Sequence, residues 1–412
     1  PSALDIWAMT FHAACVRILR ADIDRLGFSS RFTIYDTTDS QSLLKRIIKD
    51  LNLDDKVFAP RAVLTQISRA KTAMISPEDF ALEAEKGYDI RKKSLAAIYR
   101  EYDRRMKEAD ALDFDDLLLL CVRLFEENPD VLDHYQRKFR YILIDEYQDT
   151  NYLQYRFASL LAGRHENICV VGDDDQSIYR FRGATIENIL NFESEYKNAR
   201  VIRLEQNYRS TGRILSAAND VIQNNVGRKG KTLWTENEEG EPPTLYMARD
   251  ERDEASFVAG QIIAGVSQGA RWSDHAVLYR MNAQSAQFEF AFKHAGVPYR
   301  VVGGLRFFDR AEIKDVLAYL CVVSNPADNL RLSRIINTPA RGIGQATLDL
   351  VAALAEQRGM PVFEILRRSP EIEALRRAAP RLRAFVELIE GLREDSRRLP
   401  LDQLYDAVLQ RT

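Results

Sequence analysis

Two adjacent carboxylates, those of Asp145 and Glu146, have the clearest potential for chemistry, and they directly follow the apolar run of residues 141–144. A short apolar run bounded by polar residues is typical of a strand buried on both faces of a sheet. In open α/β sheets, ligands bind beyond the carboxyl ends of such strands. Two acids there can serve a phosphate-bound magnesium ion and a hydrolytic water. An acidic turn after a strand would have the same sequence, so the pair alone leaves both interpretations open.

The arrangement of an apolar run followed by polar residues recurs twice downstream. Residues 168–171 precede a polar stretch at residues 172–183, and residues 201–204 lead into residues 205–211. Residues 145–149, 172–183 and 206–211 resemble motifs II, III and IV of superfamily 1 DNA helicases, and more narrowly those of the UvrD/PcrA/Rep group. The resemblance covers essentially all 412 residues. It implies an α/β fold with RecA-like P-loop NTPase motor domains, in which helices flank parallel sheets, and with mainly helical insertions.

The resemblance also implies ATP and Mg²⁺ as cofactors and gives individual residues roles in ATP hydrolysis. Asp145 would organise the water shell of Mg²⁺, and Glu146 would polarise the attacking water. Gln176 would contact the γ-phosphate, while Tyr208 would stack on the adenine. Arg209 would act as an arginine finger, a role that suits a permanently charged guanidinium. Phosphoryl transfer depends mainly on such positioning and charge neutralisation.

The polar stretch after the second apolar run ends in alternating aromatic and cationic side chains: Tyr179, Arg180, Phe181 and Arg182. Aromatic platforms interleaved with arginines suit single-stranded nucleic acid, because stacking tolerates any base. An amphipathic edge strand with its aromatic side chains in the core would show the same alternation. The family most often has Trp where this chain has Phe181, so its ring would stack with less area.

Further DNA contacts are implied by resemblance elsewhere in the chain. Thr10, Phe11 and His12 resemble a Thr-Phe-His motif at the edge of the family's first motor domain. Arg280 and Asn282, which follow another apolar run, are candidate contacts in the second motor domain.

A glycine-containing turn at residues 338–344 precedes a predicted helix and includes Arg341, Gly342 and Gly344. Exposed backbone N–H groups in such a turn suit a phosphate. The turn resembles the family's hairpin that touches duplex DNA. A plain tight turn between helices explains the same residues nearly as well.

The length of the chain predicts more than one domain, because single cores stop growing beyond ~250–300 residues. By resemblance, residues 1–34 and 111–206 belong to motor domain 1A, and residues 35–110 form the helical insertion 1B. Residues 207–308 would be part of motor domain 2A, and residues 309–412 part of the helical insertion 2B.

Local patterns predict the elements that position these candidates. Residues 10–20 should form a helix opened by Thr10, and residues 36–110 should be helical because apolar residues recur at 3.6 spacing. Asp113 is a plausible N-cap for the helix that follows it. Residues 276–280 are a further candidate for a buried strand.

One possible phosphate-binding loop can be rejected. Residues 230–232 match the tail of a Walker A motif, but Asn225 stands where its first glycine is required. Residues 214–224 are predicted to form a helix, where a Walker A motif would follow a strand. The 412 residues therefore contain no Walker A motif, and they also lack the family's motifs V and VI. We expect the chain to begin inside a domain, and these residues alone to bind and hydrolyse ATP very weakly.

Composition argues against several other classes of protein. The four cysteines are scattered and the five histidines show no metal-ligand spacing, so neither a disulfide framework nor a zinc site is expected. No apolar run approaches the ~18 residues of a membrane span, and we expect a cytoplasmic protein. The net charge of −3 gives no sign of a nucleic-acid partner. A local patch can still bind phosphates, and from Arg331 onward there are 14 Arg, no Lys and 11 acidic residues.

The resemblance to the helicase motifs implies an ATP-dependent DNA helicase or translocase that moves on single-stranded DNA. The resemblance alone adds a 3′-to-5′ direction, junctions of single- and double-stranded DNA as partners, and a role in DNA repair, recombination or replication restart. Two other hypotheses stay open. One is a helicase-derived DNA-binding module without motor activity, and the other is the motor part of a helicase–nuclease.

Overall fold

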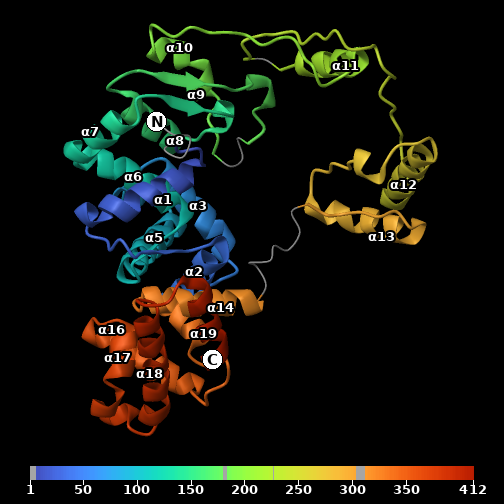
Figure 1. Ribbon diagram of the computed structural model, residues 1–412. Helices are drawn as coiled ribbons and strands as arrows, with labels where there is room; N and C mark the ends of the chain where they lie inside the picture. Colours follow the sequence, from blue (N-terminus) through green and yellow to red (C-terminus); the bar gives the residue numbers. More distant parts are fainter. Residues whose placement is uncertain (1–5, 180–182, 226, 303–310) are drawn as a thin grey trace. The chain divides into compact units, whose positions relative to one another are not determined.

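The chain is helix-rich and forms two compact units, the first comprising residues 1–201 and 311–412 and the second residues 202–310 (Figure 1). The computed structural model describes residues 6–179, 183–225, 227–302 and 311–412. Within these ranges, no helix is both long enough and apolar enough to cross a membrane.

The N-terminal part of the first unit is built from helices around two short parallel strands. Its elements are α1 (Phe11–Asp22), η2 (Ile23–Leu26), β1 (Thr33–Ile34), α2 (Thr37–Asp50), α3 (Pro60–Thr72), α4 (Pro77–Glu85), α5 (Ile90–Glu108), β2 (Ala111–Leu112), α6 (Phe114–Glu127) and α7 (Pro129–Lys138). The predicted start of the first helix is confirmed, because the Thr10 hydroxyl accepts a hydrogen bond from the Ala13 N–H. The predicted helical character of residues 36–110 is also confirmed, since four helices occupy most of that range.

The next elements build the second parallel strand pair, which carries the candidate acids. They are β3 (Ile142–Ile144), η3 (Tyr147–Asp149), α8 (Tyr152–Ala162), β4 (Ile168–Val170), η4 (Asp174–Gln176), α9 (Glu187–Leu190) and α10 (Phe192–Glu195). β3 and β4 pair in parallel, with Ile142 opposite Ile168 and Ile144 opposite Val170. These four side chains belong to one apolar cluster with Ala158 of α8. One face of the strand pair is therefore packed against neighbouring helices, α8 among them.

The prediction that this strand is buried on both faces is wrong. Leu143 is 78% exposed, whereas Ile144, one residue further, is buried. Successive side chains of a strand point to opposite faces, so Leu143 and its partner Cys169 share the second face. Within the described residues, no element covers that face. An apolar run predicted the strand, but it could not predict what would pack against each side.

The C-terminal part of the first unit is entirely helical where it is described. Its elements are α14 (Ala311–Ser324), α15 (Asn329–Ile335), α16 (Gln345–Arg358), α17 (Val362–Arg367), η9 (Ser369–Glu371), η10 (Glu373–Leu375), α18 (Ala379–Asp395) and α19 (Leu401–Arg411). Buried polar contacts join this part to the residues beside β1 and β2. The Tyr35 hydroxyl donates to the Asp328 carboxylate at 2.6 Å, and the Asn325 amide donates to the Ala109 carbonyl at 2.8 Å. These contacts lie inside the first unit.

The second unit contains α11 (Gly212–Ile222), η6 (Trp272–Asp274), α12 (Glu251–Ser267), η7 (Asn282–Gln284) and α13 (Ser285–Ala295). The prediction of a helix at residues 214–224 is confirmed by α11. α12 and α13 pack against each other through Ala259, Ile262, Phe288 and Phe292.

The predicted strands at residues 201–204 and 276–280 are not formed. In the described part of the second unit, the strand pairing is limited to an isolated bridge between Gln206 and Trp234. Leu278, in the middle of one predicted strand, is 94% exposed. A strand forms only when another segment pairs with it and satisfies its backbone hydrogen bonds. Local sequence does not show which segment will do so.

A buried ionic cluster fixes the start of α6 against α3. Asp113 caps α6 in a reciprocal capping box with Asp116, which confirms the predicted N-cap. Lys71 Nζ lies 2.6 Å from both carboxylates, and its side chain is 2% exposed. Burial opposes the charge on Lys71, but the two carboxylates outweigh it and raise the pKa of the lysine well above its usual value. Burial and the Asp113 charge raise the pKa of Asp116 to about 7.

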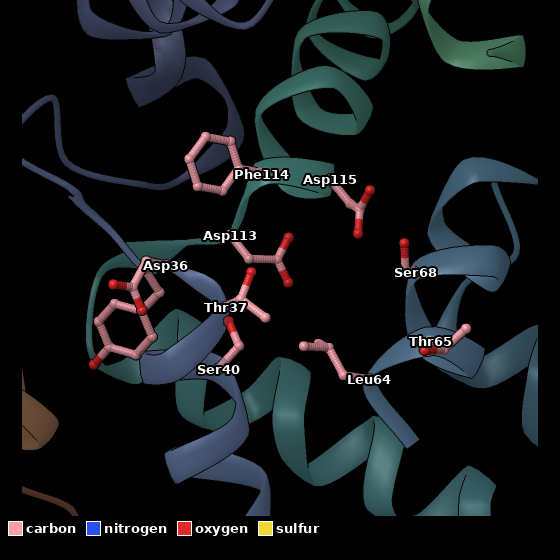
Figure 2. Close-up of a pocket in the computed structure, with 10 residues that line it drawn as sticks. Asp36, Thr37, Ser40, Leu64, Thr65, Ser68, Asp113, Phe114 and Asp115 are labelled. Carbon is pink, nitrogen blue, oxygen red and sulfur yellow. The ribbon is translucent and has the colours of Figure 1, made fainter. Parts of the chain in front are cut away.

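A pocket lies beside this cluster, between α2, α3 and the start of α6 (Figure 2). Asp113 and Asp115 line it, together with hydroxyl side chains such as those of Ser40, Thr65 and Ser68. Burial and the Asp113 charge raise the pKa of Asp115 to about 6. The start of α6 therefore combines acidic groups that take up protons near neutral pH.

Replacing Lys71 by Met should destabilise the chain by about 3–5 kcal/mol at pH 8, because two carboxylates would be left buried without their counter-charge. The loss should be smaller at pH 5. A carboxyl whose pKa is raised by folding binds its proton more readily in the folded chain than in the unfolded chain, so acid favours the folded state. Urea unfolding at both pH values measures this. Lys49→Met, on an exposed position of α2, is the matched control and should change stability by less than about 0.5 kcal/mol. An equal loss of stability at both pH values would contradict the assignment of Lys71 as the counter-charge of the two buried carboxylates.

Candidate active site

The parallel pairing of β3 and β4 brings two polar loops to the same edge of the strand pair. The ladder continues beyond the strands, because the Val171 N–H donates to the Ile144 carbonyl at 2.8 Å and the Tyr147 N–H donates to the Val171 carbonyl at 2.9 Å. The loop that begins with Asp145 and the loop that begins with Gly172 are therefore neighbours. This is the placement that the sequence predicted for the candidate acids.

Asp145 and Glu146 are exposed at this edge, and the backbone of Glu146 is unusual. Its φ is 52°, in the left-handed region that non-glycine residues rarely adopt. The Glu146 N–H donates to the Asp145 carboxylate at 3.0 Å. Strained backbone of this kind persists where surrounding contacts enforce it, and it concentrates at functional sites.

The carboxylate of Glu146 is held by the side chain of Gln148, which is almost completely buried. Gln148 Nε2 donates to Glu146 Oε2 at 2.8 Å, and Gln148 Oε1 accepts from the Asp173 N–H at 2.9 Å. Asp173 in turn accepts from Gln176, whose Nε2 lies 2.7 Å from Asp173 Oδ2. Glu146 and Gln176 are thus linked through the side chain of Gln148 and then through Asp173, whose backbone N–H bonds Gln148 and whose carboxylate bonds Gln176.

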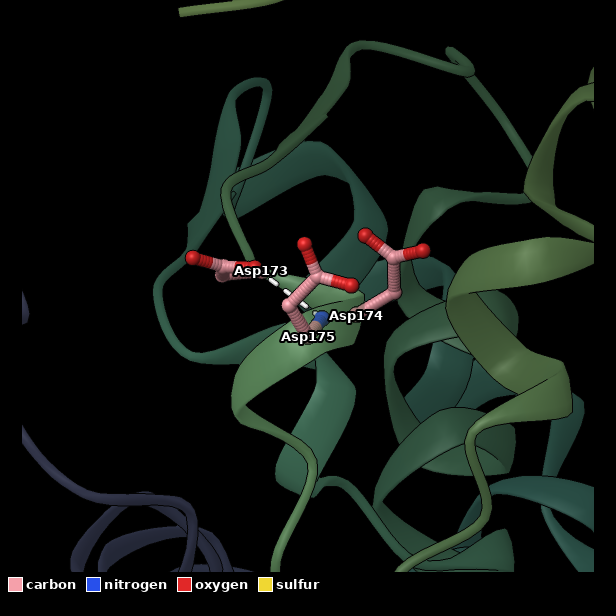
Figure 3. A group of neighbouring side chains, drawn as sticks. All are labelled: Asp173, Asp174 and Asp175. Atoms are coloured by element: carbon pink, nitrogen blue, oxygen red, sulfur yellow. Dashed lines mark hydrogen bonds between the residues drawn. The ribbon is translucent and has the colours of Figure 1, made fainter. Parts of the chain in front are cut away.

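Oxygen donors gather at the edge in a form that suits a divalent cation. The carboxylates of Asp173, Asp174 and Asp175 offer atoms within 4.8 Å of one another, and Asp173 also accepts from the Asp175 N–H (Figure 3). On the neighbouring loop, Asp149 Oδ1 is buried and has no hydrogen-bond partner among the described residues. Burial and the charge of Glu146 raise the pKa of Asp149. Mg²⁺ prefers carboxylate and water oxygens, so the donors present fit this ion.

Tyr208 and Arg209 lie in the second unit, in a turn organised by Asn207. The Asn207 side-chain oxygen accepts from the N–H groups of Arg209 and Ser210 at 2.9 and 2.8 Å. Tyr208 is 78% exposed, and its hydroxyl donates to Gln206. Their contacts with a nucleotide remain predictions.

The candidate DNA contacts at the start of α1 also serve the fold. Thr10 caps the helix, and Phe11 packs edge-on against Phe157 with ring centroids 6.2 Å apart. His12 is packed edge-on against Phe114 at 5.6 Å, and burial lowers its pKa. Phe11 and His12 are half-buried, so only part of each side chain is available to a ligand.

Some of the other candidate DNA contacts are exposed on the surface, and the rest lie outside the residues that the structure describes. Tyr179 is exposed after η4, and Arg180, Phe181 and Arg182 lie outside the described residues. Arg280 and Asn282 are exposed in the second unit, where Asn282 opens η7. Their contacts with DNA remain predictions.

The turn before α16 is held together from inside by Arg341. The guanidinium donates to the carbonyls of Ile335, Thr338 and Pro339 and, at 2.7 Å, to the Tyr319 hydroxyl. Gly342 has a φ of 67°, in the left-handed region that favours glycine. Gly344 is the N-cap residue of α16, so the predicted helix is confirmed. The structure therefore uses Arg341 within the fold, and a DNA contact by this turn stays a prediction.

Sequence reasoning gave no role to Gln148 or Asp149, although both lie in the segment recognised as motif II. A polar residue two or three positions after a candidate acid is a weak signal by itself. What marks them out is burial and the partner of each side chain, and those depend on the neighbouring loop.

Replacing Arg341 by Lys should lower the stability of the first unit by about 1–3 kcal/mol, because an ammonium cannot satisfy the same set of carbonyls. Thermal or urea unfolding measures this. Arg358→Lys, at an exposed position near the end of α16, is the control and should be nearly neutral. Unchanged stability of Arg341→Lys, together with a weaker salt dependence of DNA binding by Arg341→Ala, would instead assign the guanidinium to a phosphate.

Residues 2–197 match the family model of the UvrD/REP helicase N-terminal domain, and residues 202–377 match that of the UvrD-like helicase C-terminal domain. The chain is 48% identical over 413 residues to the ATP-dependent DNA helicase PcrA of Bacillus subtilis, a match that covers 100% of the chain and 56% of that protein. It is 46% identical over 407 residues to the helicase of the same name from Staphylococcus aureus, with 99% and 55% covered. The chain spans about half the length of these curated relatives. With both family models matched in order, the chain belongs to the UvrD/Rep family of helicases.

Proposed function

We propose that the protein containing this chain is an ATP-dependent DNA helicase whose ATP is hydrolysed at the carboxyl edge of β3 and β4. The observation that carries the proposal is the hydrogen-bonded chain from Glu146 through Gln148 and Asp173 to Gln176. It unites an acid that can act as a base with an amide that can contact a phosphate. The names of the relatives support ATP and DNA as the substrates. The parallel pairing of β3 with β4 supports a RecA-like motor domain.

Hydrolysis of ATP needs a positioned water and neutralisation of the phosphate charge. Glu146 would accept a proton from the attacking water, and its constrained backbone would limit how far the carboxylate moves. Gln176 would donate to a γ-phosphate oxygen. Asp145 would hold Mg²⁺ through water, with Asp173 and Asp149 as further oxygen donors nearby. When bound there, Mg²⁺ supplies positive charge next to the phosphates.

Family resemblance also assigns nucleotide contacts to Tyr208 and Arg209. Arg209 would place its guanidinium against the phosphates, and Tyr208 would stack on the adenine. The turn formed by Asn207 supports this assignment, because it fixes the backbone from which both side chains project. The high exposure of Tyr208 leaves its ring available to a ligand.

The DNA substrate would be a single strand, held next to a junction with duplex DNA. Tyr179 follows Gln176 by three residues, so a base stacked on it would touch the same loop that contacts the phosphate. Family resemblance supports movement in the 3′-to-5′ direction and work in DNA repair, recombination or replication restart.

Glu146→Gln in the full-length protein should leave ATP binding nearly unchanged and reduce the rate of hydrolysis by about 10²–10⁴-fold, because the amide cannot take a proton. DNA-stimulated phosphate release and nucleotide titration measure the two effects. Glu166 offers a matched control, since it is also an exposed glutamate with positive φ but precedes β4 at the other end of the strands. Glu166→Gln should hydrolyse ATP normally. Normal turnover by Glu146→Gln would remove this residue from the role of base.

Phe181→Ala should weaken single-strand binding by ~1–3 kcal/mol with little dependence on base sequence, if the ring is a stacking platform. Fluorescence titration of a labelled oligonucleotide measures the affinity, and a thermal melt of the same variant measures the fold. Phe290→Ala removes an exposed aromatic ring on α13 and should bind DNA normally. A Phe181→Ala protein that melts much earlier yet binds DNA normally would place the ring in the core.

A further inference from the structure

Gln148 is the most deeply buried polar side chain at the edge of β3 and β4, with 1% of its surface exposed. A buried amide must make hydrogen bonds, because leaving its donors or acceptor unpaired costs about 1–3 kcal/mol. Gln148 makes one bond to each of the two loops of the candidate site. Both of these side-chain hydrogen bonds therefore go to residues of the candidate site.

The orientation of the amide follows from its two partners. An ionised Glu146 carboxylate can only accept, so it must face the Nε2 of Gln148. The Asp173 N–H can only donate, so it must face Oε1. Turning the amide over would place oxygen against oxygen and N–H against N–H. The two loops consequently fix the side chain, and the side chain fixes the distance between the loops.

The two hydrogen bonds of the Gln148 amide, to Glu146 and to Asp173, form a bridge between the loops. The backbone around Gln148 is adapted to this bridge. A Cβ on Gly172 would lie 2.6 Å from Gln148 Oε1 and 2.8 Å from a methyl group of Ile189, so only glycine lets the second loop come this close. On the other side, η3 begins immediately after the strained Glu146 and brings Gln148 back under its carboxylate. Both loops thus pass the bridge at short range.

We infer that Gln148 is a positioning residue that holds Glu146 and couples it to the loop carrying Gln176 and Tyr179. This inference rests on the proposed ATP hydrolysis, because it assigns a role within that reaction. Through Gln148, any displacement of Asp173 changes the hydrogen bond that orients the Glu146 carboxylate. A base stacked on Tyr179, six residues after Asp173, acts on the same loop. Gln148 therefore provides a direct physical link by which bound DNA alters the hydrolytic residue.

Two substitutions in the full-length protein separate the functions of the bridge. Gln148→Glu keeps an acceptor for the Asp173 N–H but removes the donor to Glu146 and places a second carboxylate beside it. Gln148→Met keeps the approximate volume and removes both hydrogen bonds. Each should lower kcat for DNA-stimulated ATP hydrolysis by about 10–100-fold, the range typical for residues that orient a metal ligand through a hydrogen bond. The KM for ATP should change less than about threefold, because neither substitution removes a proposed contact with the nucleotide.

Two readouts distinguish positioning from a purely structural role. In Gln148→Glu, two neighbouring carboxylates share a proton more readily, so the acidic limb of the kcat–pH profile should move to higher pH. In Gln148→Met, the ratio of DNA-stimulated to basal hydrolysis should fall. Gln136→Met is the control, because Gln136 is a half-buried glutamine of the same unit whose amide bonds the Leu160 carbonyl, away from both loops. It should lose stability but keep its kinetics.

Gly172→Ala tests the same bridge without changing Gln148, since the added methyl group must displace the amide oxygen. It should reproduce the fall in kcat, and it keeps the test decisive if a Gln148 variant does not fold. Glu146→Gln, measured in parallel, separates a failure of the positioning role of Gln148 from a failure of the proposed ATP hydrolysis at Glu146. If Glu146→Gln is inactive while the Gln148 and Gly172 variants keep normal kcat, normal pH dependence and normal DNA stimulation, the bridge has no positioning role. If Glu146→Gln itself remains active, the proposed function is wrong at this site.

Discussion

The parallel pairing of β3 with β4 is the constraint on which the candidate site depends. Strands that run in the same direction end at the same edge, so the loops that begin with Asp145 and Gly172 must meet there. The ladder bonds from Val171 and Tyr147 extend this alignment by several residues beyond the strands. Acids and amides that lie almost thirty residues apart in the sequence thereby become neighbours, because the pairing of the strands alone brings them together.

A left-handed residue and a buried amide then convert this proximity into a defined geometry. Glu146 has an uncommon backbone conformation that costs on the order of 1–3 kcal/mol, and surrounding contacts must offset that cost. Gln148 supplies one such contact and at the same time fixes the opposite loop through the Asp173 N–H. The absence of a side chain at Gly172 is part of the same arrangement. Strain, burial and close approach therefore occur together at the place where hydrolysis is proposed.

The sequence predicted the parts of this structure that are decided locally. The caps at Thr10 and Asp113, the helices of residues 36–110 and the acids after β3 all follow from short patterns. It failed at the strands of the second unit, because pairing depends on segments far away in the chain. It also missed Gln148, since nothing local distinguishes a buried glutamine whose partner is Asp173 from an exposed one. Resemblance to a family supplied the roles, and physical patterns alone would have left an acidic turn as an equal alternative.

The central claim is that the edge of β3 and β4 is where ATP is hydrolysed, with Glu146 oriented by Gln148. A crystal structure of the full-length protein with Mg²⁺ and a non-hydrolysable ATP analogue tests it most directly. The account predicts the terminal phosphate within hydrogen-bonding distance of Gln176, a water between that phosphate and Glu146, and Gln148 Nε2 still bonded to the Glu146 carboxylate. An analogue bound away from this edge, or a Gln148 amide turned away from Glu146 with the nucleotide in place, would contradict it.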